Sequence, residues 1–155
     1  MNNIFQFKMR KLKQNLLLIV WISAITYVHA QSPNSAVTGK WNSENNESVI
    51  LLEEKNGKIN GKIVELKDPN DPDGTPKKDK HNPKPELRDK PIVGLTILTD
   101  LKTDGNNTWT GGRIYDPRTG HSYKCEMKLD GDVLKIRGYM GIKMLGKTTT
   151  WTRAK

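Results

Sequence analysis

Short segments rich in β-branched and aromatic residues recur from residue 39 to residue 153, and residues that favour turns separate them. No stretch in this part of the chain repeats its apolar residues with a helical period. The rhythm predicts eight strands at 39–42, 48–55, 58–67, 93–101, 108–115, 122–129, 133–139 and 147–153. Most of the connections suit hairpins, so we predict an all-β fold in which an antiparallel meander closes into a barrel.

Two motifs stand at opposite ends of this series. Gly39-Lys40-Trp41 falls on the first strand, and Trp151-Thr152-Arg153 falls on the last. In a small barrel whose first strand pairs with its last, a Trp on one strand can stack under an Arg on the other. That contact seals one end by apolar burial and by cation–π attraction. We therefore predict a structural role, closure of the barrel, for Trp41, Trp151 and Arg153.

Residues 1–30 have the pattern of a secretory signal peptide. Four basic residues precede the apolar run 16–28, which is followed by a small-residue cleavage signal at Ala30. The run is shorter than the roughly 20 residues that a membrane-spanning helix needs. We expect cleavage near Ala30 and a single periplasmic or secreted domain over residues 31–155, with an uncleaved N-terminal anchor as the alternative.

Removing this segment lowers the charge of the chain. It holds four of the 26 basic residues and none of the 17 acidic ones, which leaves 22 against 17 and a net charge of +5. The remaining Lys and Asp are interspersed, which is typical of a solvated surface, so we expect no nucleic-acid partner. The single Cys125 allows no intrachain disulfide. We expect a monomer stabilised by its core and by closure of the sheet.

One segment, Asp68 to Lys90, is too long for a hairpin connection and contains five prolines, at 69, 72, 76, 83 and 85. Long connections in compact domains are usually functional lids or disordered insertions. We expect this loop to fold over one mouth of the barrel or to lie along its wall. A short helical turn is predicted at 85–88, where Pro85 suits a first helical position.

The best candidates for a functional role are Arg and Tyr side chains, namely Arg113, Tyr115, Arg137, Tyr139 and Arg88. Strict alternation in 108–115 places Arg113 and Tyr115 on the face of Trp109. If that face is the inner one, Arg113 enters the barrel and needs a carboxylate, an aromatic face or an anionic ligand. Pairing of Arg113 with an Asp is the structural alternative. Gly111-Gly112 predicts a sharp bend or a close backbone approach here.

The sequence contains little that indicates a catalytic site or a metal-binding site. The run Asp68, Asn70, Asp71, Asp73, Gly74 suggests calcium, but an EF-hand register puts Pro69 at the first ligand position and Lys80 at the twelfth. His81 lies in a Lys-rich segment and His121 lies at a turn, and no serine sits in a nucleophile elbow. Cys125, on the apolar face of a strand, is typical of a small core residue. We expect no enzyme activity, no metal and no cofactor.

Several of these motifs together resemble a family of exported bacterial proteins, domain-of-unknown-function family 2147. The resembling stretches, which cover almost the whole chain after residue 38, are Gly39-Lys40-Trp41, 61–64, 66–69, Asn82-Pro83, Leu87-Arg88, Pro91, Gly94-Leu95, 111–117, Gly120, Tyr123, 134–139 and 150–153. The Lys-rich segment 77–81 is the one marked departure. The resemblance implies a lipocalin-type calycin fold and implies no activity, because none is established for the family.

The leading functional hypothesis is a small-ligand-binding barrel that takes an amphipathic or acidic molecule. Its anchor would be Arg113 or Tyr115, and its apolar walls would be Ile63, Leu95, Ile97, Met127 and Ile136. The alternative is an envelope module with a solid barrel, which would meet anionic lipid headgroups or an acidic partner through the Pro-rich loop. The residues involved would then be Lys77, Lys78, Lys80 and Arg88.

Overall fold

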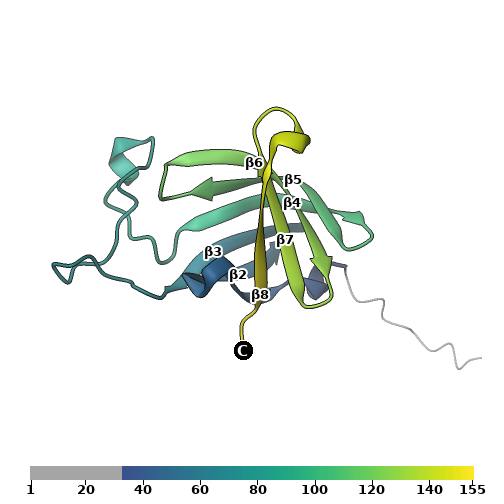
Figure 1. Ribbon diagram of the computed structural model, residues 1–155, viewed down its shortest axis with the longest axis horizontal. Helices are drawn as coiled ribbons and strands as arrows, with labels where there is room; N and C mark the ends of the chain where they lie inside the picture. The colour runs from purple at the N-terminus through teal and green to yellow at the C-terminus, as the bar shows by residue number, and fades with distance from the viewer. Residues whose placement is uncertain (1–32) are drawn as a thin grey trace, which may run out of the picture. The chain divides into compact units, whose positions relative to one another are not determined.

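The computed structural model describes residues 33–155, so the predicted signal peptide lies outside the described residues. Within this range eight strands follow one another around a closed barrel, and each neighbouring pair is antiparallel (Figure 1). They are β1 (Gly39–Asn42), β2 (Ser48–Lys55), β3 (Lys58–Leu66), β4 (Thr96–Gly105), β5 (Thr108–Asp116), β6 (His121–Asp130), β7 (Val133–Tyr139) and β8 (Lys147–Arg153). The predicted all-β meander barrel is confirmed.

The barrel closes between its first and last strands. Trp41 of β1 lies opposite Arg153 of β8, and Asn42 lies opposite Thr152. The remaining strands stay close to their predicted bounds, except that β4 begins at Thr96 and runs on to Gly105. Its start is delayed because Gly94, at φ +95°, makes a turn whose N–H donates to the carbonyl of Ile63.

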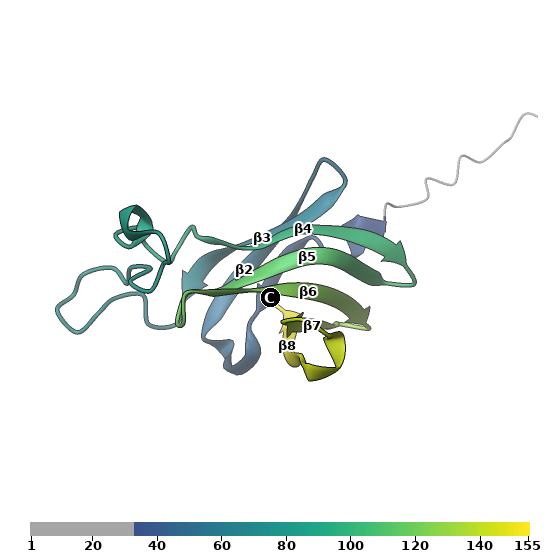
Figure 2. The same cartoon turned by 90° about the horizontal axis from the view of Figure 1, so that it is seen from above.

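Connections in such a meander alternate between the two ends of the barrel. The β2–β3, β4–β5 and β6–β7 turns lie at one end, which we call the floor, together with the 3-10 turn η1 (Pro33–Ala36). The β1–β2, β3–β4, β5–β6 and β7–β8 connections lie at the other end, which we call the mouth. Figure 2 shows the β3–β4 and β5–β6 connections at this end. Short 3-10 turns occur in three of these mouth connections: η2 (Glu44–Asn46), η3 (Pro85–Leu87) and η4 (Lys143–Leu145). The segment η3 begins at Pro85, as predicted.

Two buried tryptophans form the floor. The indole N–H of Trp41 donates to the carbonyl of Val37 at 2.8 Å, and that of Trp109 donates to Asn34 Oδ1 at 2.8 Å. Both rings are fully buried. These bonds fasten the segment before β1 across the end of the barrel, because a buried indole N–H needs a partner.

Arg153 covers the outer side of Trp41. Its guanidinium carbon lies 4.1 Å from the centre of the ring, which is the distance of a cation–π contact. The same guanidinium donates to the carbonyl of Thr38 at 2.7 Å and to the carbonyl of Ala36. The Trp41–Arg153 pair therefore joins the first and last strands and also holds the segment before β1, whereas Trp151 lines the cavity in the other half of the barrel.

Buried apolar side chains pack together in the floor half of the barrel. The buried apolar residues there are Val37, Trp41, Leu52, Ile59, Leu98, Leu101, Trp109, Cys125, Met127 and Leu134. Fully buried aliphatic and aromatic side chains of this size are the main source of stability in a small domain without a disulfide. Within residues 33–155 no helix has the length and apolar character that crossing a membrane requires.

Candidate functional site

The mouth half of the barrel is hollow. A cavity of about 960 Å³ opens at the end opposite the two floor tryptophans. Its deep wall is apolar and consists of Ile50, Ile63, Ile97, Ile114, Ile136 and Trp151. An eight-stranded barrel of this kind has room for one small ligand, and a volume near 1,000 Å³ is at the upper end for small-molecule sites.

Of the five residues expected to form apolar walls, three line this cavity: Ile63, Ile97 and Ile136. Met127 instead lies beside Trp109 in the packed floor, and Leu95 lies at the end of the β3–β4 connection, just before β4. Alternation along a strand predicts that a side chain points into the barrel, but not whether it lies in the floor half or in the mouth half. That position along the barrel axis depends on how far the large floor side chains extend.

The rim of the cavity is polar and carries both signs of charge. Its basic residues are Lys67, Lys77, Arg118 and Lys147, and its acidic residues are Glu44, Glu47, Asp68 and Asp116. The formal charges of this set cancel. The rim therefore has no excess of positive charge that would select an anion by long-range attraction alone.

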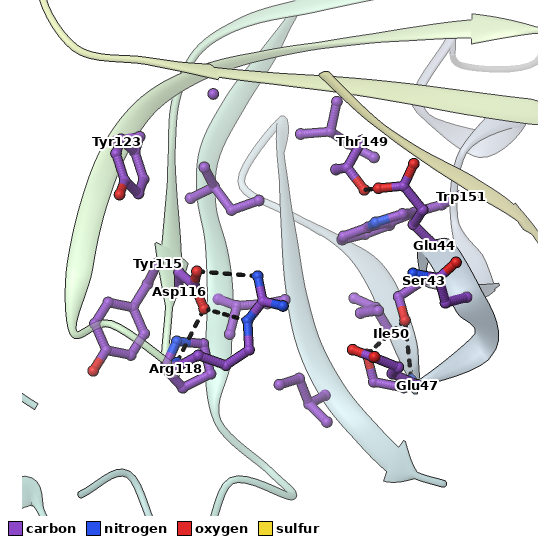
Figure 3. A pocket seen from close by; sticks show the side chains of 18 of the residues that line it. Ser43, Glu44, Glu47, Ile50, Tyr115, Asp116, Arg118, Tyr123, Thr149 and Trp151 are labelled. Atoms are coloured by element: carbon purple, nitrogen blue, oxygen red, sulfur yellow. Dashed lines mark hydrogen bonds and ion pairs between the residues drawn. The ribbon is translucent and has the colours of Figure 1, made fainter. Parts of the chain in front are cut away.

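Arg118 lies on one side of this rim, in the β5–β6 turn. Its Nε and Nη2 donate to the two carboxylate oxygens of Asp116 at 3.1 and 3.2 Å. Burial alone would raise the pKa of Asp116, but the hydrogen bonds and charge of Arg118 hold it below its usual value. Glu47 acts on Arg118 electrostatically from across the mouth, and Figure 3 shows the guanidinium between the two sides.

The β1–β2 connection forms the opposite side of the rim. Thr149 Oγ1 of β8 donates to Glu44 Oε2 at 3.1 Å, while Ser43 Oγ accepts the backbone N–H and the hydroxyl of Ser48 at 2.9 and 3.0 Å. These bonds hold η2 against the end of β8, as Figure 3 shows. The sequence identifies neither this set nor Arg118, because Ser, Asn and Asp at a turn usually signal only the turn.

Tyr115 lines the cavity and also makes a contact that the sequence did not predict. Its hydroxyl donates to Asp79 Oδ1 at 2.7 Å, and the amide of Asn82 donates to the other carboxylate oxygen at 2.7 Å. Asp79 is fully buried. Burial, and then the bond to Asp79, raise the pKa of the Tyr115 hydroxyl well above its usual value, so it remains a donor. Tyr115 therefore fastens the Pro-rich loop to the barrel.

Two further contacts hold the Pro-rich loop. Arg88 Nε donates to the carbonyl of Asn82 at 2.8 Å, so Arg88 also serves the loop itself. A Cβ on Gly120 would lie 1.9 Å from the carbonyl oxygen of His81, which shows how closely the β5–β6 turn meets the loop. The loop projects beside the mouth in Figure 1 and contributes Asp68 and Lys77 to the cavity.

Two lysines of this loop are paired with acidic neighbours. Lys78 pairs with Asp89 at 2.9 Å, and Lys80 pairs with Asp71 at 2.7 Å. The alternative hypothesis combined a basic loop with a solid barrel, whereas the mouth half of this barrel is hollow. The solid-barrel part of that alternative is therefore wrong.

Arg137 and Tyr139 lie near the mouth on β7. Tyr139 lines the cavity, but Arg137 does not. The guanidinium of Arg137 instead donates to the carbonyls of Lys143 and Met144 and to Thr148 Oγ1, at 2.9, 3.0 and 3.0 Å. Its role is to fix the β7–β8 connection.

Arg113 lies on the outer surface of the barrel, so the conditional prediction that it enters the barrel is wrong. A β-bulge shifts the register of β5 between Trp109 and Gly112. Gly111 takes φ +75°, and after it the alternation is reversed, so that Gly112 and Ile114 face inward. A Cβ on Gly112 would lie 2.5 Å from Leu101 Cγ, which confirms the close approach expected at this pair of glycines.

The aspartates of the Pro-rich loop make turns and ion pairs. Asp73 Oδ1 accepts from the N–H and the hydroxyl of Thr75 at 2.9 and 2.6 Å, and these bonds lower the pKa of Asp73. Asp71 faces Lys80. Within residues 33–155 no three His, Cys, Asp or Glu side chains are grouped as metal ligands would be.

Cys125 is fully buried in the floor half, and burial raises the pKa of its thiol to about 12. Because the thiolate is the reactive form, we expect Cys125 to be alkylated roughly a thousandfold more slowly in the folded protein than in guanidinium at the same mildly alkaline pH. Mass spectrometry after iodoacetamide treatment measures both rates. Equal rates would show that the thiol is accessible.

A closed eight-stranded meander with a packed floor and a cavity open at the other end defines a lipocalin-like β-barrel. The chain belongs to the family described as "Uncharacterized protein conserved in bacteria (DUF2147)", whose model matches residues 39–153. This confirms the resemblance seen in the sequence.

A solved structure supports the same class. Protein HP1028 from the human pathogen Helicobacter pylori, described as belonging to the lipocalin family, is similar with a TM-score of 0.67 and 28% sequence identity. The match covers 76% of this chain and 82% of that one. No curated protein matches the chain.

Proposed function

We propose that the protein binds one small amphipathic molecule in the mouth half of the barrel and does not transform it chemically. The observation that carries this proposal is the division of the cavity into an apolar depth and a polar rim of balanced charge. Apolar walls with a few polar groups at one end are typical of small-molecule sites. The lipocalin-like fold is compatible with this function but does not supply it.

The rim suggests what kind of head group the ligand carries. Arg118 already makes a two-point contact with Asp116, so an anionic head would have to replace a well-formed pair. Lys147 and Glu47 line the same rim and make no ion pair within the described residues. A polar or zwitterionic head therefore fits this rim better than a purely acidic one.

We also propose that the barrel acts outside the cytoplasm, as the signal-peptide pattern of residues 1–30 indicates. Export suits a carrier, because amphipathic molecules leave and enter membranes slowly without a protein that shields their apolar part. The shielding surface here is the wall formed by Ile50, Ile63 and Trp151.

Filling the cavity tests the proposal. We expect the neutral fluorescent probe N-phenyl-1-naphthylamine to bind the wild-type protein, and Ile114→Trp to weaken binding by at least about tenfold, which corresponds to about 1.4 kcal/mol. Ile114 is half-buried and lines the cavity, so a larger side chain there has room to turn into it.

Lys128→Trp is the matched control, because Lys128 is exposed on β6 and does not line the cavity. Thermal melts followed by circular dichroism verify that both variants fold. Equal probe affinity in the wild-type and Ile114→Trp proteins would place the binding elsewhere and refute the proposal.

A further inference from the structure

The connection between β7 and β8, residues 140–146, carries an unusual set of exposed apolar side chains; we call it the rim loop. Met140, Ile142, Met144 and Leu145 are 68, 60, 86 and 81% exposed. Among residues 33–155 the one other exposed large apolar side chain is Val93, and it is only 41% exposed. Single exposed apolar residues are ordinary, but a contiguous group marks an interaction site.

The rim loop holds these side chains outward with a fixed backbone. Arg137 binds the carbonyls of Lys143 and Met144, and the N–H of Gly146 donates to the carbonyl of Lys143 at 3.0 Å. Lys143 Nζ lies 2.5 Å from Glu126 Oε2 on β6. Because these bonds hold the backbone of the loop against the barrel, the four apolar side chains stay on the surface.

The rim loop also lies at the mouth of the cavity. Met140 and Leu145 line the cavity at its rim, beside Tyr139 and Lys147. In Figure 1 the loop forms the yellow turn between β7 and β8, away from the floor end where the C-terminus lies. A partner surface that binds the rim loop would therefore lie next to the opening of the cavity.

The chemistry around the rim loop favours a lipid surface. The segment 140–147 contains no acidic residue. Its Lys143 is paired with Glu126, whereas Lys147 and Lys124, which lies opposite Tyr139 on the next strand, make no ion pair within the described residues. Apolar side chains flanked by lysines are typical of segments that insert into the boundary of a bilayer while the cations remain among anionic headgroups. A single projecting turn is also small beside the roughly 800 Å² that each partner buries in a stable protein interface.

We propose that the rim loop docks the protein on bilayers that contain anionic lipid, with Ile142, Met144 and Leu145 inserted and Lys147 at headgroup level. Docking presents the cavity mouth to the membrane, from which an amphipathic ligand enters directly. This second step rests on the proposed carrier function, whereas the docking itself does not.

Vesicle co-sedimentation of the processed chain, which contains the whole barrel of residues 33–155, tests the docking. We expect the wild-type protein to bind vesicles of phosphatidylcholine mixed with phosphatidylglycerol more strongly than vesicles of phosphatidylcholine alone. The double substitution Ile142→Ser with Met144→Ser, at two exposed rim-loop residues that do not line the cavity, should lower partitioning roughly 10- to 100-fold, because two apolar side chains no longer insert. Val93→Ser is the control and should leave partitioning unchanged.

Fluorescence provides a second measurement that does not depend on an altered affinity. Leu145→Trp places an exposed indole on the rim loop, while Trp41, Trp109 and Trp151 are buried. We expect brominated lipids to quench the new emission and to shift it to shorter wavelength on vesicle binding. An indole that remains unquenched on bound vesicles would show that another surface docks.

The remaining outcomes are also decisive. No vesicle binding by the wild-type protein, or equal binding by the double variant, overturns the proposal. A wild-type dimer that the double variant converts to a monomer in light scattering would show that a second copy covers the loop, which also overturns it. The double variant should still bind N-phenyl-1-naphthylamine in solution; if the wild-type protein binds vesicles but not this probe, docking stands and the carrier function fails.

Discussion

Trp41→Ala is expected to lower the free energy of unfolding by about 3–5 kcal/mol, the usual cost of removing a large buried aromatic side chain. The indole is fully buried and its N–H bonds to Val37. Its loss also removes the aromatic face over which Arg153 lies at 4.1 Å, and thereby weakens the one seam that closes the sheet. Chemical denaturation followed by circular dichroism measures the change.

Trp41→Phe is the matched variant for this experiment. It keeps an aromatic face under Arg153 but removes the hydrogen bond to Val37, so its loss of stability should be clearly smaller than that of Trp41→Ala. If Trp41→Ala cost less than about 1 kcal/mol, the floor would not be the part of the barrel that holds it closed.

Tyr115→Phe is expected to release the Pro-rich loop without unfolding the barrel. The substitution leaves the fully buried Asp79 carboxylate with the Asn82 amide as its remaining side-chain donor. A hydrogen bond to a charged group contributes about 1.5–3 kcal/mol, so amide exchange in the loop should accelerate roughly 10- to 100-fold. Hydrogen exchange followed by mass spectrometry resolves the loop peptides from those of the strands.

Tyr123→Phe is the control for this effect. Tyr123 also lies near the mouth, but within residues 33–155 its hydroxyl makes no hydrogen bond. It should leave exchange in the loop unchanged. Equal exchange of the loop in the wild-type and Tyr115→Phe proteins would show that the contact between Gly120 and His81 holds the loop by itself.

The strand pattern made the fold predictable, because alternation and turn chemistry are local properties of the sequence. Asn56-Gly57 and Asp130-Gly131 end strands where expected, and the terminal motifs at Trp41 and Arg153 meet across the closing pair. Closure could be anticipated because a meander of this length has few other ways to cover its edge strands.

The candidate site was harder to predict, and β5 shows why. A single bulge residue, Gly111, reverses the inward face of everything that follows it, and this places Arg113 outside and Ile114 in the cavity wall. A pair of glycines indicates that a bend is near, but not which of the two residues is the extra one.

Asp79 shows a second limit of sequence reasoning. It stands in the Lys-rich segment 77–81, where a carboxylate is normally solvated, yet it is fully buried against Tyr115. Long-range partners of this kind, 36 positions apart, leave no local pattern. The same holds for Arg118, whose turn position gives no sign of its place at the rim.

Native mass spectrometry of the processed protein with an added lysophospholipid tests the central claim most directly. One spectrum gives both the mass of the chain and the number of ligand molecules bound to it. The account predicts a chain that begins at Gln31, a single bound molecule on the wild-type and Lys128→Trp proteins, and its loss in Ile114→Trp. A spectrum without the adduct, or with the same adduct in Ile114→Trp, would contradict a ligand-binding cavity in the mouth half of the barrel.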